Sequence, residues 1–236
     1  MIGAAAVGTL AIFSVQVLGR TERIASDAVP NRVVLADGSN VTLDSFSAIE
    51  VTMKHDARLI RLVRGEAMFV VARDKSRPFS VDAEGTRVSA TGTAFSVRMG
   101  QQITDLTVTE GSVRVTTKAG GANLKAGQAA AVSGQAMARV SVDEQTIARR
   151  LAWRNGWLAF DGETLEQAVG AFNRYRREPI VVGDPAIAGK PIRGRFATFD
   201  AAGFIDDLRL KYGIVAVTAT DGTVVLTGGA VAKPDA

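Results

Sequence analysis

Residues 153–161 read Trp-Arg-Asn-Gly-Trp-Leu-Ala-Phe-Asp and begin the stretch, residues 153–227, whose pattern decides the fold. Residues 156–160 show the alternation that predicts a β-strand. Thr164 follows, and Gln167 three residues later completes a capping box, which is typical of a helix start. The residues that would then share one apolar face of this helix are Leu165, Ala168, Val169 and Phe172.

The rest of the stretch predicts four more strands and a second helix. Pro179 ends the first helix, and residues 180–182 and 191–199 read as strands. Asp200 begins the second helix and Gly213 ends it. Asp221-Gly222 then predicts a hairpin that joins strands 214–217 and 223–227. A small domain with two helices on short sheets and no evident catalytic set favours docking through a sheet edge or a helix face.

Single residues of this domain have structural interpretations. Trp153, Trp157 and Phe160 are predicted to be core residues, in preference to a role in stacking on a ligand. Asn173 is predicted to form hydrogen bonds at the helix end. The small and polar residues 228–236 predict a flexible tail.

Residues 29–140 predict β-strands throughout. Residues 36–39, Ala-Asp-Gly-Ser, form a turn signal between two apolar runs, and glycines punctuate the short strands that follow. This pattern is typical of a sandwich, a barrel or a β-roll. Residues 20–28 are predicted to be a linker, and residues 141–152 a short polar linker helix. The expected fold class is therefore mainly β, with a small α+β domain at the C-terminus.

Composition excludes several functions. The 236 residues contain no cysteine, so disulfides, thiol catalysis and thiolate metal sites are excluded. The net charge is +4, but the arginines are spread along the chain without a nucleic-acid-binding motif, which favours an ordinary solvated surface. Arg58, Arg61 and Arg64 would not all share one face of a strand.

No catalytic or metal-binding set is apparent. The single histidine, His55, lies in the polar turn Met53-Lys54-His55-Asp56, and the 24 acidic residues are scattered. No glycine-rich phosphate loop opens a helix. The sequence therefore predicts a protein that is not an enzyme and that needs no cofactor or metal.

The N-terminal residues 1–19 carry no charged side chain and predict a membrane span. A buried core helix is the alternative, but the small residues near the start suit a span better. Arg20 and Arg23 follow the run and no basic residue precedes it, which by charge alone would leave the rest of the chain in the cytoplasm. An upstream cytoplasmic part with its own basic flank would resolve this conflict.

Several motifs follow one another in a fixed order between residues 34 and 113. They are Val34-Leu35-Ala36-Asp37-Gly38-Ser39, Arg64-Gly65-Glu66-Ala67-Met68-Phe69-Val70-Val71, Arg77-Pro78-Phe79-Ser80-Val81, Ala90-Thr91-Gly92-Thr93-Ala94-Phe95-Ser96-Val97 and Val108-Thr109-Glu110-Gly111-Ser112-Val113. Together these motifs resemble the FecR family of anti-sigma regulators and transmembrane sensors. Residues 153–227 resemble the C-terminal half of that family, which is similar to the short signalling domain at the start of secretins and TonB-dependent receptors. The matching positions are Trp153, Gly156, Leu158, Phe160, Asn173, Tyr175, Ile192, Gly194 and Phe196.

The resemblance implies a single-pass inner-membrane protein with the bulk of the chain in the periplasm. It implies that the periplasmic part binds the signalling domain of a TonB-dependent outer-membrane receptor. Regulated proteolysis would then relay iron-siderophore availability to an extracytoplasmic-function sigma factor, through a cytoplasmic part absent from this sequence. The alternatives are a structural docking module at a secretin-like assembly and an envelope enzyme, which the absence of a site disfavours.

The resemblance also implies a chemical role for Gly92-Thr93. Some family members cleave themselves between a glycine and a threonine in this motif, through attack of the threonine hydroxyl on the preceding carbonyl. A strained turn would assist this attack. The structural alternative is a tight start of a strand that requires a small residue beside Phe95.

Overall fold

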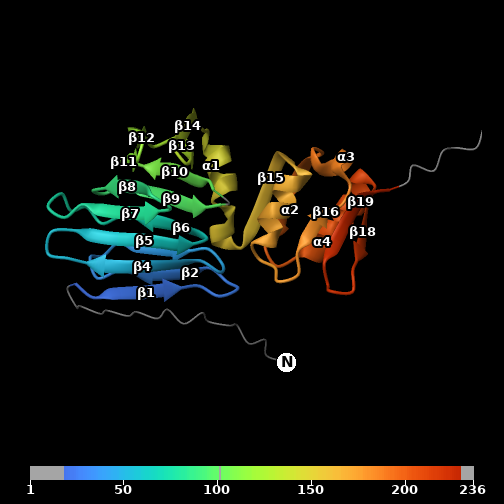
Figure 1. Cartoon of the computed structure of the whole chain (residues 1–236), viewed down its shortest axis with the longest axis horizontal. Coiled ribbons are helices and arrows are strands. Elements are labelled where there is room, and N and C mark those ends of the chain that lie inside the picture. Colours follow the sequence, from blue (N-terminus) through green and yellow to red (C-terminus); the bar gives the residue numbers. More distant parts are fainter. Residues whose placement is uncertain (1–18, 101, 230–236) are drawn as a thin grey trace, which may run out of the picture. The chain divides into compact units, whose positions relative to one another are not determined.

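The computed structural model describes residues 19–100 and 102–229 (Figure 1). Contacts divide the chain into two compact units. Among the described residues, the first unit contains residues 19–26 and 31–142, and the second contains residues 27–30 and 143–229.

The first unit is built from two seven-stranded sheets. The first sheet has the order β1-β4-β5-β7-β8-β11-β12, with the bounds Thr21–Ala25, Ala48–Met53, Arg58–Arg64, Phe79–Ala83, Thr86–Ala90, Ser112–Thr117 and Gly120–Lys125. The second has the order β14-β13-β10-β9-β6-β3-β2, with the bounds Ala136–Ser141, Gln128–Ser133, Thr104–Glu110, Ala94–Met99, Glu66–Val70, Asn40–Leu43 and Asn31–Val34. All paired neighbours are antiparallel except β5 and β7, which are parallel.

The chain passes repeatedly from one sheet to the other. The hairpins β4-β5, β7-β8 and β11-β12 belong to the first sheet, and β2-β3, β9-β10 and β13-β14 belong to the second. Some corners between the sheets are very short: Gly65 alone joins β5 to β6, and Gly111 alone joins β10 to β11. The connection from β6 to β7, residues 71–78, is longer and is called the crossover below.

Apolar side chains fill the space between the two sheets because successive residues of a strand face opposite sides. Phe69 and Phe95 stack with ring centroids 5.3 Å apart, and Phe79 packs edge-on against Phe69 at 5.9 Å. All three rings are fully buried. The prediction of a β-rich domain in this region is therefore confirmed, and its form is a pair of sheets joined at corners.

Several strands differ from the sequence-based expectation. The predicted linker over residues 20–28 is wrong for Thr21–Ala25, which forms β1 and pairs antiparallel with β4. The strand lies at a sheet edge and is largely exposed, so most of its residues are polar and the sequence lacks the apolar alternation of a buried strand. The strands β12 and β14 are likewise edge strands with few buried residues.

The second unit has two small sheets and two main helices. β15 (Trp157–Thr164) pairs antiparallel with β17 (Pro191–Ala197). The other sheet has the order β16-β19-β18, with the bounds Ile180–Val182, Val224–Gly228 and Ile214–Thr218. The helices are α1 (Glu144–Arg150), α2 (Leu165–Asn173), α3 (Pro185–Ala188) and α4 (Ala201–Tyr212), with a 3₁₀-helix over Ala152–Asn155.

Local signals set the helix ends of this unit. Thr164 and Gln167 form the predicted capping box, and the Asp200 side chain accepts a hydrogen bond from the Gly203 N–H. Gly213 ends α4 in the left-handed conformation. The predicted face of α2 is buried in a core that also contains Phe160, Phe204 and Leu208. The expected α+β domain is therefore confirmed.

Two short helices of this unit had not been predicted, and one local prediction was wrong. The unpredicted helices are the 3₁₀-helix over residues 152–155, before the strand, and α3 over residues 185–188. Trp153 and Phe160 are buried as expected, but Trp157 is only half-buried. Its ring instead lies against the Arg195 guanidinium, 4.3 Å from ring centroid to guanidinium carbon, on the outer face of β15 and β17.

The predicted membrane span, residues 1–19, lies outside the described residues apart from Gly19. Within the part of the chain that the structure describes, no helix has the length and apolar character needed to cross a membrane. Of the predicted tail, residues 228–236, all residues beyond Gly229 also lie outside the described part.

Candidate functional site

The Gly92-Thr93 junction lies where the chain leaves β8 in the first sheet and enters β9 in the second. Gly92 has φ +146°, a backbone conformation that residues with a side chain rarely adopt. A Cβ atom at Gly92 would also lie 3.1 Å from Cβ and Cγ of Arg73 in the crossover. The backbone conformation therefore favours glycine here, and a larger residue would also press against Arg73.

The Thr93 hydroxyl is unusual because it is buried and has no hydrogen-bond partner. Thr93 is 6% exposed, and its Oγ1 is one of four buried side-chain polar atoms without a partner among the described residues. Leaving a buried hydroxyl unpaired costs about 1–3 kcal/mol, so such an atom needs an explanation. A hydroxyl that no other group binds is available for chemistry at the adjoining peptide.

Gly111, in the corner between β10 and β11, closes the junction from another side. A Cβ atom at Gly111 would lie 2.9 Å from Cγ2 of Thr93 and 3.4 Å from the carbonyl oxygen of Gly92. Gly111 also has a positive φ of +72°. The fold thus brings Gly92, Thr93 and Gly111 together, although the sequence analysis named only the first two as site residues.

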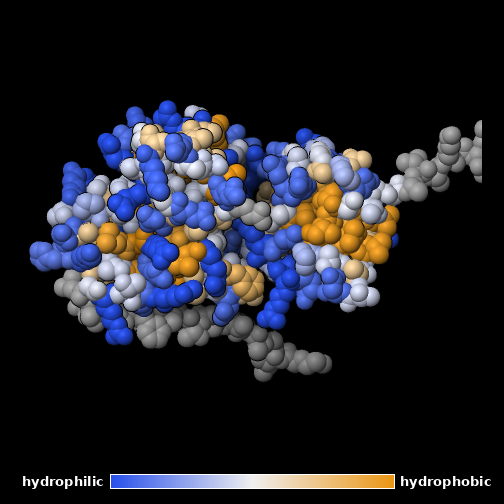
Figure 2. Space-filling view, in the orientation of Figure 1, coloured by the Kyte–Doolittle hydropathy of each residue, from blue (hydrophilic) through white to orange (hydrophobic). Residues whose placement is uncertain are grey.

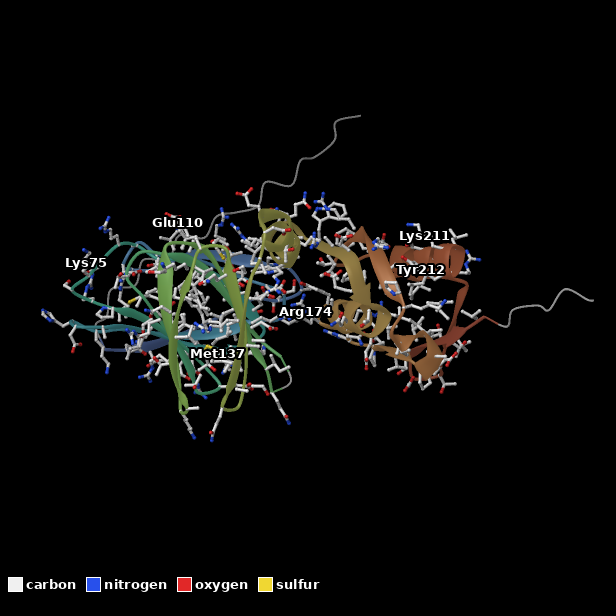
Figure 3. All side chains as sticks on the ribbon, turned by 90° about the horizontal axis from the view of Figure 1, so that it is seen from above. Lys75, Glu110, Met137, Arg174, Lys211 and Tyr212 are labelled. Carbon is white, nitrogen blue, oxygen red and sulfur yellow. The ribbon has the colours of Figure 1, made fainter. Side chains whose placement is uncertain are left out.

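The crossover forms backbone hydrogen bonds on both sides of the junction. The N–H of Val71 donates to the Thr93 carbonyl at 2.9 Å, and the N–H of Asp74 donates to the Thr91 carbonyl at 3.2 Å. Lys75, at the exposed tip of the crossover, projects away from the sheets (Figure 3). The backbone on both sides of Gly92 is therefore attached to one connecting segment.

A buried arginine holds the crossover in turn. The Arg58 side chain is 0% exposed and forms an ion pair with Asp37 at 2.7 Å. Its guanidinium also donates to the carbonyl oxygens of Ala72 at 2.9 Å, Asp74 at 3.2 Å and Arg77 at 2.8 Å. Its guanidinium carbon lies 5.4 Å from the centroid of the Phe79 ring.

Arg58 was not among the predicted site residues. The sequence predicted only that Arg58, Arg61 and Arg64 would not all share one face, and this is confirmed because Arg58 is buried while Arg61 is exposed. One signal was present: Arg58 has the same strand parity as Ile60 and Leu62, which are core residues. A charged residue on an apolar strand face indicates a buried ion pair, although not its partner.

The Asp74 carboxylate stabilises the crossover from within. It accepts hydrogen bonds from the Ser76 hydroxyl at 2.6 Å and from Nε of Arg77 at 2.8 Å, and also from the backbone N–H groups of these two residues. Hydrogen bonds from the Ser76 and Arg77 side chains lower the pKa of Asp74 well below its ordinary value, and the two backbone N–H groups add to this effect. These four hydrogen bonds favour the ionised carboxylate and connect residues 74–77 of the crossover.

Most predicted docking-domain positions prove to be structural. Leu158, Phe160 and Ile192 are buried in the core, and Phe196 packs partly against it. Trp153 is 1% exposed. Gly156 takes the left-handed conformation after the 3₁₀-helix, and a Cβ at Gly194 would lie 2.8 Å from the Phe196 ring.

The polar motif residues connect secondary-structure elements. The Asn173 amide donates to the Ile180 carbonyl at 2.7 Å and accepts from the Ile180 N–H at 2.8 Å, so it fixes β16 to the end of α2 as predicted. Tyr175 packs partly against the core. Tyr212, at the end of α4 beside Lys211 (Figure 3), accepts a hydrogen bond from the Arg193 N–H at 3.1 Å.

The outer face of the three-stranded sheet is the apolar surface of this unit. Val181, Val225 and Val217 lie in one row across β16, β19 and β18, and Val215 follows in the next row. Val217 is 57% exposed, Val215 44% and Val181 39%. Figure 2 shows hydrophobic side chains gathered over these strands. None of the three strands contains a charged residue, and β18 is an edge strand.

No metal or acid–base set accompanies these surfaces. Within residues 19–100 and 102–229, no group of three or more His, Asp or Glu side chains could hold a metal ion. His55 lies exposed in the turn between β4 and β5, as its polar surroundings predicted.

Comparisons with known proteins agree with this architecture. Residues 25–114 match the model of the family described as FecR protein. Two crystal structures of a protein from Parabacteroides distasonis, provisionally described as an anti-sigma factor, share the fold with a TM-score of 0.75 each. The identities are 22% and 21%, over 89% and 88% of this chain and 99% of each of those chains. No curated protein matches the chain.

Proposed function

Because residues 25–114 match the model of the FecR protein family, we propose that the chain is the sensing part of a regulator of sigma-factor signalling. In this proposal the chain is anchored in the inner membrane, and its described part lies in the periplasm. It binds the signalling domain of a TonB-dependent outer-membrane receptor and relays iron-siderophore availability to an extracytoplasmic-function sigma factor. It acts by binding and carries out no turnover of a small-molecule substrate.

The observation that carries the docking role is the uncharged outer face of the three-stranded sheet. Exposed β-branched residues in a row that ends at the edge strand β18 form a surface that natural proteins usually cover or interrupt with charges. A partner strand could pair with β18 and extend the row of valines. This surface supports a protein partner.

Replacing Val217 with lysine is expected to weaken binding of a receptor signalling domain by about 2 kcal/mol, or about thirtyfold in Kd. The charge would lie in the apolar row, while the core stays intact because Val217 points outward. Titration calorimetry with the purified full chain in detergent measures the effect. Leu210→Lys is the matched control, because Leu210 is 77% exposed on α4 and lies on another surface.

Equal loss in the two lysine variants would contradict the surface assignment. Failure of the unmodified chain to bind any receptor signalling domain, together with binding to a secretin, would favour the alternative function. That alternative is a structural docking module of the cell envelope, and it would use the same face of the second unit.

We further propose that the relay includes self-cleavage between Gly92 and Thr93. Oγ1 of Thr93 attacks the carbonyl carbon of Gly92, the peptide C–N bond breaks, and the hydroxyl proton passes to the new amine of Thr93. Water then hydrolyses the resulting ester, which gives the Gly92 carboxylate and restores the hydroxyl. The unpaired buried hydroxyl and the positive φ of Gly92 support this chemistry.

Replacing Thr93 with alanine is expected to abolish the fragments 1–92 and 93–236, because the nucleophile is removed. Replacing it with serine should retain them, since the hydroxyl remains. Mass spectrometry of the freshly purified chain measures the fragment ends. Fragments with unchanged ends and yield in Thr93→Ala would show that another protease makes the cut.

A further inference from the structure

One side chain anchors the crossover through its backbone carbonyl groups. The Arg58 guanidinium is fully buried and donates to three crossover carbonyls, those of Ala72, Asp74 and Arg77. A guanidinium has five N–H donors in a rigid fork, so it can hold several acceptors in one arrangement. The Asp37 carboxylate, 2.7 Å away, neutralises its charge and fixes its position.

The turn that carries Asp37 bonds to the same segment. The Asp37 carboxylate accepts hydrogen bonds from the N–H and the hydroxyl of Ser39 at 3.0 and 2.6 Å. The Ser39 hydroxyl oxygen in turn accepts a hydrogen bond from the N–H of Ala72 at 3.0 Å. Both polar groups of the Ala72 backbone are therefore held by the Asp37–Arg58 network.

The opposite side of the crossover is attached to the junction. Val71 donates to the Thr93 carbonyl and Asp74 to the Thr91 carbonyl. Between them, Arg73 lies so close that a Cβ at Gly92 would meet its backbone Cα at 3.2 Å. Residues 71–74 thus connect Arg58 directly to the peptide groups on both sides of Gly92.

We propose that Arg58 is a positioning residue for the Gly92-Thr93 junction. It fixes the crossover, and the crossover fixes the backbone on both sides of the bond that breaks. Arg58 touches none of the reacting atoms, so it acts only through residues 71–74. This role rests on the self-cleavage proposed above.

The test compares the cleavage rates of Arg58→Met and Arg61→Met in the full chain. Arg61 is the matched control because it lies on the same strand with a side chain that is 69% exposed. The fraction cleaved is followed over time by mass spectrometry. Arg58→Met is expected to cleave roughly 100-fold more slowly, as a misplaced reacting group does, while Arg61→Met cleaves like the unmodified chain. An unchanged rate in Arg58→Met would overturn the proposal.

Two further variants separate positioning from stability. In Asp37→Leu/Arg58→Met the buried pair is replaced by apolar groups, which commonly restores stability. We expect the melting temperature of this double variant to exceed that of Arg58→Met. Its cleavage should stay slow, because no guanidinium group holds the three crossover carbonyls. Arg58→Lys keeps the charge opposite Asp37 but loses the fork, so it should also cleave slowly. Cleavage rates that simply follow melting temperature across these variants would reduce Arg58 to a structural role and refute the inference.

Hydrogen exchange gives a readout that does not depend on cleavage. If the unmodified chain shows no self-cleavage, the proposed reaction fails, and exchange at the N–H groups of Val71 and Asp74 decides the positioning role alone. Arg58→Met should speed exchange of these two groups by roughly tenfold or more relative to Arg61→Met. Equal exchange in the two variants would refute the positioning role.

Discussion

Replacing Phe172 with alanine is expected to lower the free energy of unfolding of the second unit by about 3–5 kcal/mol. Phe172 is fully buried and stacks on Phe204 with ring centroids 4.2 Å apart. Phe196 and Phe160 lie 6.0 and 6.2 Å away, so one truncation leaves a cavity next to three rings. Lost burial and lost ring contacts therefore add up at this position.

Intrinsic fluorescence can measure this effect selectively. The chain has two tryptophans and two tyrosines, and all four, Trp153, Trp157, Tyr175 and Tyr212, lie in the second unit. Urea unfolding followed by tryptophan emission thus reports on that unit. Phe199→Ala is the control, because Phe199 is 87% exposed and its loss should change stability by less than about 0.5 kcal/mol. Equal midpoints for the two variants would contradict the packing argument.

Replacing Asp37 with alanine is expected to cost the first unit about 3–5 kcal/mol, because it leaves the Arg58 charge buried without a counter-charge. Both side chains are almost fully buried, 0% and 2% exposed, so water cannot take the place of the carboxylate. The hydrogen bonds from Ser39 would also be lost. Because this unit has no tryptophan or tyrosine, urea unfolding is followed by far-UV circular dichroism.

Glu50→Ala provides the comparison for Asp37→Ala. Glu50 of β4 pairs with Arg61 of β5 at 3.4 Å, but those side chains are 28% and 69% exposed. An exposed pair contributes only about 0–1 kcal/mol. If both variants lost the same small amount, the Arg58–Asp37 pair would not be the anchor that its burial indicates.

The features that the sequence predicted well are those set by neighbours in the chain. Three such features are the capping box at Thr164, the left-handed Gly213 and the turn at Asp37. Each depends on residues a few positions apart, so each can be predicted from the sequence. Helix faces and buried strands follow from periodicity. The pattern therefore indicated both fold classes, and the motifs indicated the FecR family.

The features that were missed depend on residues far apart in the chain. Arg58 meets Asp37 and Arg77, which are 21 and 19 residues away, and no local rule pairs them. Gly111 lies against Thr93 only because β10 and β11 meet at a corner beside the junction. Edge strands such as β1 carry polar residues and lack the alternation that reveals a buried strand. Candidate chemistry was therefore found at Gly92 and Thr93, but not the groups that support it.

The alternation of hairpins between the sheets has a consequence for a severed chain. A cut after Gly92 would leave strands of both fragments in each sheet. In the first sheet, the N-terminal fragment would contribute β1, β4, β5, β7 and β8, and the C-terminal fragment β11 and β12. In the second sheet, the N-terminal fragment would contribute β2, β3 and β6, and the C-terminal fragment the other four strands. The ladders β8-β11 and β6-β9, together with the shared interior, would still join the two halves. Cleavage would thus yield two fragments that remain associated through both sheets. Separating the two fragments would require mechanical pulling or the degradation of one of them.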